Sequence, residues 1–295
     1  MDTDGRGTRP TYVGRVPRSP DATRTRTRRY THLEMIVATI RSFITYIAAL
    51  AYIAVAGPLG LLFAAVFKWK RGLYALGHGG TWLALGLAGI RYRVSGREHV
   101  PPGAVVFCSN HESNVDPPVL FLSLHPQLHI LYKAELHKFP IMGTAFDVGG
   151  FVAVERDNRE RAMESISRGA ESLRSGNSFL IFPEGTRSRT GALLPFKKGG
   201  FIMAIQAQVP IVPVAVQGGR AAMRKGSAIV RPVRVSVRIG EPIPTKGLTL
   251  DDRDILIERV RNTIRTLLDE GPLWEIPKSK SQIPNPKSQT PSSIS

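Results

Sequence analysis

The sequence predicts an α/β fold in which a mixed sheet is flanked by helices, preceded by an N-terminal membrane helical hairpin. Three observations support this prediction. Short apolar runs alternate with helical segments after Val94, one later segment alternates apolar with polar residues, and a long uncharged stretch precedes both. Strands that alternate with helices along the chain indicate an α/β sandwich with a largely parallel or mixed sheet.

The composition limits the kinds of protein this can be. The chain has 295 residues, 42% of them hydrophobic, which is enough for one substantial α/β domain plus accessory segments. Its single cysteine, Cys108, excludes an intramolecular disulfide framework and a multi-cysteine metal site. The formal net charge of +17 favours anionic partners, which include nucleic acid, an anionic leaflet and phosphate-bearing substrates.

Four segments follow from the pattern of composition. Residues 1–34 are rich in Arg, Thr, Pro and Gly, and we expect a disordered basic tail there. A cleaved transit peptide and a translation start at Met35 are alternatives for this segment. We expect the hydrophobic hairpin over residues 35–90, the α/β domain over residues 91–275, and a second disordered tail over residues 276–295.

The hairpin consists of two apolar stretches. Residues 42–67 carry no charge and exceed the ~20 residues that cross a bilayer as a helix, whereas residues 73–90 form a weaker second stretch. Proline at position 58 predicts a kink or break, which leaves each half of the first stretch too short to span. A re-entrant or interfacial hairpin, with the basic cluster Lys68–Arg71 among the headgroups, fits this pattern. The alternative is a pair of buried core helices in a soluble protein.

The elements of the α/β domain are predicted from hydrophobic periodicity. Five short apolar runs read as buried strands: 104–108, 128–132, 151–154, 178–182 and 211–216. Residues 233–239 alternate apolar and polar side chains, which predicts a half-exposed strand. Amphipathic periodicity predicts helices over residues 159–175 and 251–270.

Two polar segments carry the chemistry. Asn110 and His111 follow the strand at 104–108, and Asp116 before Pro117 has the form of a helix N-cap. A carboxylate that accepts from one imidazole nitrogen leaves the other as a base near neutral pH. The turn 182–188 leaves another predicted strand and offers a guanidinium to an anionic group. A structural histidine beside a capping aspartate is the simpler alternative.

These segments resemble the phospholipid and glycerol acyltransferases, a family that includes 1-acylglycerol-3-phosphate acyltransferase. Asn110, His111 and Asp116 match the family's first motif, and Phe182–Ser188 matches the third. The segment 150–156 is similar to the second motif with Arg156 preserved, although Ala153 and Glu155 depart from it. Residues 209–214 are similar to the fourth.

The resemblance implies a role for each of these residues. His111 would be the general base and Asp116 its orienter; the substrate-binding residues would be Arg156, Glu184, Gly185, Thr186 and Arg187. The donor would be acyl-CoA or acyl-carrier protein, with no cofactor and no metal. The best acceptor is lysophosphatidic acid, and glycerol-3-phosphate, another lysophospholipid or a lyso-aminolipid are alternatives. We expect a membrane protein whose catalytic domain lies on the cytoplasmic side.

Two readings from other classes compete with this one. A zinc hydrolase is suggested by His111-Glu112, but position 115 is Val where that metal-binding pattern needs histidine, and Pro126 weakens the pair His125 and His129. A basic membrane-surface or nucleic-acid-binding protein is suggested by the Arg-rich N-terminus. We expect no specific nucleic acid partner, because no zinc-finger or RNP-type signature is present.

Overall fold

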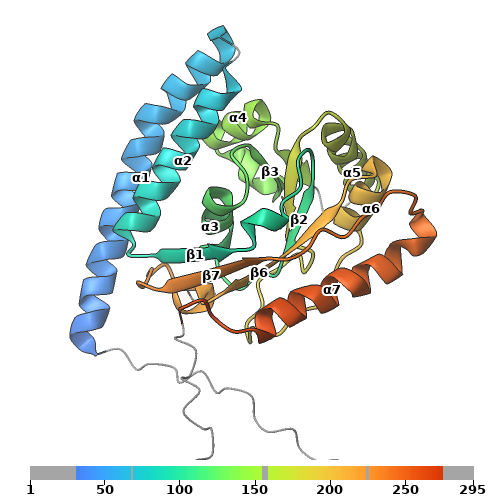
Figure 1. Ribbon diagram of the computed structural model, residues 1–295. Helices are drawn as coiled ribbons and strands as arrows, with labels where there is room; N and C mark the ends of the chain where they lie inside the picture. The colour runs from blue at the N-terminus through green and yellow to red at the C-terminus, as the bar shows by residue number, and fades with distance from the viewer. Residues whose placement is uncertain (1–30, 68, 155–158, 224–225, 275–295) are drawn as a thin grey trace, which may run out of the picture.

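The computed structural model describes residues 31–67, 69–154, 159–223 and 226–274. Within them lies a seven-stranded sheet with the order β1-β7-β6-β2-β5-β3-β4 (Figure 1). Neighbouring strands are parallel except β6 and β7, which are antiparallel, so the predicted mixed sheet is confirmed. The strands are β1 (Arg91–Ser95), β2 (Val106–Ser109), β3 (Leu128–Lys133), β4 (Val152–Val154), β5 (Ser178–Ile181), β6 (Ile211–Gln217) and β7 (Arg234–Ile239).

Helices cover both faces of this sheet, which explains why its central strands are apolar throughout. Val105 and Phe107 face one core, shared with α2 (Lys70–Leu87) and α3 (Asp116–Ser123). Val106 and Cys108 face a second core, shared with α5 (Arg159–Arg174), α6 (Gly199–Ala207) and α7 (Arg253–Asp269). A strand buried on both faces reads as a continuous apolar run. The helices after the hairpin are α3 (Asp116–Ser123), α4 (Pro140–Gly149), α5 (Arg159–Arg174), α6 (Gly199–Ala207) and α7 (Arg253–Asp269). Short 3-10 helices in the described residues are η1 (Arg97–His99), η2 (Ala134–Lys138), η3 (Gly219–Ala221) and η4 (Leu250–Asp252).

The predicted hairpin consists of α1 (His32–Phe67) and α2 (Lys70–Leu87), which run side by side along one flank of the domain (Figure 1). A capping box fixes the start of α1: Thr31 N–H donates to Glu34 Oε2 at 2.9 Å and Glu34 N–H donates to Thr31 Oγ1 at 3.2 Å. The helix therefore begins before the boundary expected at residue 35. The rest of the predicted N-terminal tail, like the predicted tail over 276–295, lies outside the described residues, and the four-part division stays a prediction.

Of the kink or break expected at Pro58, the break does not occur, because α1 continues through this proline as one helix. Helix α1 contacts α2 on both sides of Pro58. Before it, the Tyr52 hydroxyl donates to the Leu76 carbonyl at 2.9 Å. After it, Gly60 lies against the side chains of Leu73 and Leu76. The premise that each half is too short to span is therefore wrong.

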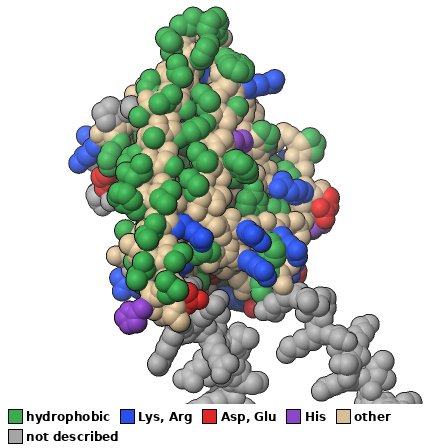
Figure 2. All heavy atoms as spheres, turned by 90° about the vertical axis from the view of Figure 1, so that its left-hand side faces the viewer, with side chains coloured by type: hydrophobic (Ala, Val, Ile, Leu, Met, Phe, Trp, Pro, Cys, Tyr) green, Lys and Arg blue, Asp and Glu red, His purple; other side chains and the backbone are tan. Residues whose placement is uncertain are grey.

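The outward face of α1 is apolar and uncovered. Only 11% of its most apolar window is buried, and its mean hydropathy there is 2.1, so α1 is long and apolar enough to cross a membrane. The side turned toward the domain carries Ala38, Ser42 and Thr45, all buried. The alternative of buried core helices is thus wrong for α1, whose large side chains point away from the protein (Figure 2).

All six strands expected from the sequence are present, with boundaries that differ by one or two residues. The helices expected over 159–175 and 251–270 correspond to α5 and α7. Three elements lacked a prediction: β1, α4 and α6. Strand β1 alternates arginines with Tyr92 and Val94 over only five residues at the sheet edge, and α6 is apolar around most of its circumference, so it shows no helical period.

Candidate active site

The strands β2, β5 and β6 are parallel neighbours, so their carboxyl ends meet at one edge of the sheet. The His111 loop (residues 110–116) follows β2, the Glu184 turn (residues 182–188) follows β5, and η3 comes shortly after β6. Ligands of open α/β sheets bind outside the carboxyl ends of the strands. The topology therefore brings together the two motifs that the sequence singled out.

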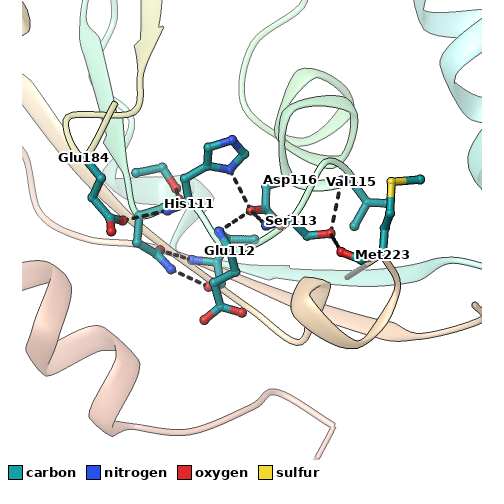
Figure 3. Close-up of polar contacts among 10 residues, drawn as sticks. His111, Glu112, Ser113, Val115, Asp116, Glu184 and Met223 are labelled. Atoms are coloured by element: carbon teal, nitrogen blue, oxygen red, sulfur yellow. Dashed lines mark hydrogen bonds and ion pairs between the residues drawn. The ribbon is translucent and has the colours of Figure 1, made fainter. Parts of the chain in front are cut away.

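His111 and Asp116 form a hydrogen-bonded pair in this loop (Figure 3). His111 Nδ1 is 2.9 Å from Asp116 Oδ2; the imidazole is 16% exposed, whereas the carboxylate is fully buried. A carboxylate that accepts from Nδ1–H fixes the tautomer in which Nε2 is the basic nitrogen. The pair can therefore take a proton from a hydroxyl group placed at Nε2.

The Asp116 carboxylate is held by the loop around it. Its Oδ2 accepts two further hydrogen bonds, both of 2.6 Å, from the backbone N–H groups of Glu112 and Ser113 (Figure 3). Its Oδ1 is buried against Gly219 of η3, where an added Cβ atom would overlap with the oxygen. Glycine at position 219 is thus required by the close approach of η3 to the carboxylate.

The expectation that Asp116 caps the following helix is wrong. Helix α3 begins at Asp116 itself, Val115 occupies the capping position, and no side-chain cap is formed. A capping aspartate at position 116 would accept from the N–H of residue 118 or 119. Pro118 has no N–H, and the Val119 N–H already donates to the Val115 carbonyl. The carboxylate therefore turns back toward the loop and the imidazole.

The backbone of His111 is tied to the Glu184 turn on both sides. Its N–H donates to Glu184 Oε1 at 2.9 Å, and its carbonyl accepts from the Ser188 N–H at 2.8 Å. The imidazole also stacks on Phe182, with 4.3 Å between ring centroids and 29° between planes. The two sequence motifs are therefore in direct contact and hold each other in place.

Asn110 fixes the start of the His111 loop against β6. Its Nδ2 donates to the Val216 carbonyl at 2.8 Å, and its Oδ1 accepts from the Val216 N–H at 2.7 Å. The side-chain amide thus makes the two hydrogen bonds to β6 that the backbone of a neighbouring strand would otherwise make. Because Asn110 is almost fully buried, this pair sets the direction in which His111 leaves the sheet.

Glu184 joins three segments of the site. Besides the bond to His111, its Oε2 accepts from the Leu194 N–H at 2.9 Å, and its side chain is almost fully buried. Burial raises the pKa of Glu184, while the two backbone donors oppose that shift. Its observed partners are main-chain amides, so contact with an acceptor hydroxyl or an arginine stays a prediction.

The other predicted binding residues fall into two groups. Gly185, Thr186 and Arg187 lie in the Glu184 turn; Thr186 is exposed and Arg187 is half-buried. Gly185 has φ +66°, and a Cβ atom there would lie 2.8 Å from Lys197 Cε and 3.0 Å from Lys197 Nζ. Arg156 lies outside the described residues, so the structure does not place it beside the pair.

Lys197 is a cation of this site that was not among the predicted binding residues. Its N–H donates to the Pro183 carbonyl at 2.8 Å, and its side chain extends along Gly185. The next residue, Lys198, points elsewhere, because its Nζ lies 3.5 Å from Asp254 Oδ1 at the start of α7. The sequence shows two adjacent lysines, and only the fold tells them apart.

Glu112 is a second group that sequence reasoning missed. Burial raises its pKa to about 7, the negative charge of Asp116 adds to the shift, and Arg220 opposes it. Glu112 Oε1 and Arg220 Nη1 both lie near Gly191, at 3.9 Å and 3.2 Å from the position of an added Cβ atom. The Glu112 carboxyl points away from the imidazole, so it belongs to the wall of the site (Figure 3).

The residues considered for metal or nucleophilic chemistry lie in other surroundings. Cys108 is buried in β2, and burial raises the pKa of its thiol. His129 packs against Phe179 with ring centroids 5.2 Å apart, and His125 Nδ1 accepts from the Gln127 N–H at 3.1 Å. No group of three or more His, Cys, Asp or Glu residues suited to a metal ion occurs in the described part of the chain. That the reaction needs neither metal nor cofactor stays a prediction.

Comparisons with known proteins give the family of this chain. Residues 91–217 match the family model described as "Acyltransferase". The chain is 36% identical to "1-acyl-sn-glycerol-3-phosphate acyltransferase alpha" of Homo sapiens, over 62% of this chain and 66% of that protein. It is 34% identical to the "1-acyl-sn-glycerol-3-phosphate acyltransferase" of Limnanthes alba, over 67% of this chain and 71% of that protein. Thus the chain spans just under two thirds of the human protein's length.

A solved structure has the same fold. It is the crystal structure of the 1-acyl-sn-glycerophosphate (LPA) acyltransferase PlsC from Thermotoga maritima, with a TM-score of 0.72 and 24% sequence identity. The match covers 82% of this chain and all of that one. The relatives identify the chain as a member of the 1-acyl-sn-glycerol-3-phosphate acyltransferase family.

Proposed function

We propose that this protein transfers an acyl chain from acyl-CoA or acyl-carrier protein to the sn-2 hydroxyl of lysophosphatidic acid, giving phosphatidic acid. The observation that carries the proposal is the His111–Asp116 pair, 2.9 Å apart at the sheet edge where the Glu184 turn also lies. The relatives, which are named 1-acyl-sn-glycerol-3-phosphate acyltransferases, support the reaction class.

The proposed chemistry follows from the basic nitrogen of His111. Nε2 takes the proton of the acceptor hydroxyl as that oxygen attacks the thioester carbonyl carbon. The tetrahedral intermediate then collapses: the carbon–sulfur bond breaks, and the leaving thiolate takes the proton from the imidazolium. Asp116 keeps the imidazole in one tautomer and stabilises its positive charge between these steps. No covalent enzyme adduct forms, so Cys108 has no role.

The acceptor phosphate is proposed to bind at the Glu184 turn. Arg187 and Lys197 both belong to this region, and guanidinium and ammonium groups donate charge-assisted hydrogen bonds to phosphate oxygens. Gly185 and Thr186 would contribute the turn itself, and Glu184 would hold it against His111. Arg156 would complete the clamp. The same attack by a hydroxyl group would occur with glycerol-3-phosphate, another lysophospholipid or a lyso-aminolipid. An assay with each acceptor therefore distinguishes between them.

We also propose that the hairpin associates with the membrane and that the catalytic domain works on the cytoplasmic side. The support is the uncovered apolar face of α1 and the Trp69 and Trp82 side chains, which are 55% and 69% exposed. Contiguous apolar surface of this kind marks membrane or protein contact. Both lipid reactant and lipid product would remain in the leaflet that the hairpin contacts.

The decisive experiment measures transfer of a labelled acyl group from acyl-CoA to lysophosphatidic acid in membranes. His111→Ala should abolish turnover, because no other group replaces Nε2. The matched control is His137→Ala, since His137 Nε2 lies 2.8 Å from Asp147 Oδ2 in a second histidine–aspartate pair that is exposed on the surface.

Three outcomes separate the proposals. Loss in His111→Ala alone supports both the reaction and the base. Equal rates in wild type and His111→Ala would refute the base. If wild type fails with lysophosphatidic acid but transfers to another acceptor, the proposed acceptor is wrong and the reaction class stands.

A further inference from the structure

An exposed group of arginines lies beside α1, outside the site described above. Residues 228–232 connect α1 to the sheet: Ser42 Oγ accepts from the Val230 N–H at 2.8 Å, and the Tyr46 hydroxyl donates to the Ala228 carbonyl at 2.6 Å. This segment leads directly into β7. Its neighbour β1 begins at the same level, because the Arg91 N–H donates to the Val233 carbonyl. The first residues of both strands are therefore adjacent to the apolar helix.

The strand register puts the arginines on one face of this sheet edge. Arg91 pairs with Arg234, and Arg93 pairs with Ser236, so alternate residues of β1 and β7 share a face. The opposite face carries Tyr92, Val94, Val235 and Val237, which pack in the core. Arg91, Arg93 and Arg234 are exposed as a result, whereas Arg238 farther along is paired with Glu270 at 2.8 Å.

Trp274 holds two of these arginines together. The guanidinium carbon of Arg93 lies 4.0 Å from the centre of the Trp274 ring, and that of Arg234 lies 5.1 Å from it. Trp274 is itself fixed, since its Nε1–H donates to the Val235 carbonyl at 3.3 Å. No ion pair of Arg91, Arg93 or Arg234 with a carboxylate is recorded among residues 31–67, 69–154, 159–223 and 226–274. Like charges kept this close favour an anionic ligand.

The apolar side chains of α1 continue this surface at the same level. Three of them lie close in sequence to Ser42 and Tyr46, which bind segment 228–232. They are Ile36, Ile40 and Phe43, which are 57%, 55% and 67% exposed. Figure 2 shows Lys and Arg side chains gathered beside the lower half of the hydrophobic hairpin. A cationic rim next to an apolar face fits a leaflet, whose anionic headgroups lie above its hydrocarbon.

We infer that Arg91, Arg93, Arg234 and Trp274 form a binding surface for the headgroups of anionic phospholipids, here named the arginine surface. It rests on the proposed membrane association and adds to it a preference for anionic leaflets. The indole lies at headgroup depth, where tryptophan is favoured, and the guanidiniums contact lipid phosphates. The arginine surface also fixes the rotation of the domain about α1, which the apolar face alone leaves open.

The test compares binding of the purified full-length protein to phosphatidylcholine vesicles and to vesicles that also contain phosphatidylglycerol. The measured quantity is the ratio of the two partition coefficients. Basic residues near an anionic leaflet each contribute about fivefold, so Arg93→Gln/Arg234→Gln should lower the ratio by roughly 25-fold. The double variant Arg93→Lys/Arg234→Lys keeps the charge and should retain most of the preference.

Arg174→Gln/Arg265→Gln is the matched control, because it removes the same charge from α5 and α7. Loss of Arg93 could disturb the fold, because its guanidinium also donates to the Leu273 carbonyl at 3.3 Å. Arg91→Gln avoids this problem, because Arg91 contacts its neighbour Val233 through its backbone N–H. It should lower the ratio about fivefold. The Arg-rich residues 1–30 are present in every variant, so their contribution to vesicle binding is the same in each measured ratio.

Each other outcome overturns the inference in a distinct way. Wild type that binds both vesicles equally refutes the arginine surface and leaves membrane association intact. Wild type that binds neither vesicle refutes both. An equal loss in the α5 and α7 control shows that net charge, not this surface, sets the preference. Binding to a DNA duplex that the Arg93/Arg234 variant loses, with an unchanged vesicle ratio, assigns the surface to nucleic acid.

Discussion

The His111 loop buries polar groups, whereas the outer face of the hairpin exposes apolar ones. In the loop, buried polar groups find partners within the protein: Asn110 pairs with Val216, and Asp116 accepts three hydrogen bonds. On α1, the residues turned inward are small or hydroxylated, and the large apolar ones face outward. The loop leaves one buried atom, Asp116 Oδ1, without a hydrogen bond to the described residues, whereas the hairpin leaves a whole apolar face uncovered. The two regions should therefore fail independently.

The largest effect is expected in the loop, from Asp116→Asn. An amide keeps the shape but removes the charge that fixes the His111 tautomer, so kcat should fall by about 10³-fold. Activity in membranes gives this number, and flotation on vesicles should show unchanged binding. A loss of vesicle binding would contradict the independence of the two regions.

Gly219→Ala is expected to have the next largest effect. The added Cβ overlaps with Asp116 Oδ1 and displaces the carboxylate, and a displacement of ~1 Å in a catalytic group lowers the rate by about 10²-fold. The control is Gly86→Ala in α2, where a Cβ meets nothing within 4 Å. Similar kcat values for the two variants would show that η3 adapts and that the close approach is not required.

The hairpin face is tested by Ile40→Lys. A lysine placed against lipid hydrocarbon is disfavoured by about 2 kcal/mol, which is roughly a 30-fold loss in partitioning to phosphatidylcholine vesicles. Ile255→Lys is the matched control, because Ile255 is 73% exposed on α7, far from the hairpin in Figure 1. If both variants bind as well as wild type, the apolar face of α1 does not contact lipid.

Lys197→Met sharpens the comparison within the site. If Lys197 contacts the acceptor phosphate as proposed, removing its charge should raise KM for lysophosphatidic acid about tenfold while kcat changes little. Lys198→Met, which alters a side chain near Asp254, should leave KM unchanged. Equal effects in the two variants would mean that neither lysine is specific for the phosphate.

A pH dependence of stability, rather than of activity, is expected from Glu112. Its folded pKa of about 7 lies above its ordinary value of 4.5, so its contribution to stability is full below 4.5 and is lost as pH rises through about 7. Glu112→Gln should remove this loss, and the free energy of unfolding should then fall less between about pH 5 and pH 8. Glu164→Gln on the exposed face of α5 is the control. Parallel pH curves for Glu112→Gln and wild type would contradict the shift.

Sequence reasoning succeeded where the signal was local. The strand runs are apolar because both faces are buried, and the order Asn110, His111, Asp116 is readable in a single loop. It failed where a distant segment decides the outcome. Helix α1 continues through Pro58 beside α2, and Pro118 lacks one of the N–H groups that an Asp116 cap would use.

The parts of the site that were missed depend on contacts across the chain. Lys197 reaches the Glu184 turn, and Gly219 reaches Asp116, only because β2, β5 and β6 are neighbours in the sheet. Nothing in the local sequence distinguishes Lys197 from Lys198 or Gly219 from Gly218. The same holds for β1, which becomes a strand by pairing with β7.

The two hydrogen bonds between the Asn110 side chain and the Val216 main chain limit how this site can be built into another protein. If the segment Asn110–Asp116 were copied onto another scaffold, the Asn110 side chain would lose its two partners, the carbonyl and the N–H group of Val216. A designer would have to graft a neighbouring parallel strand, a glycine beside the aspartate and a carboxylate beneath the histidine amide. The smallest portable unit is thus a patch of three strand ends, not a peptide.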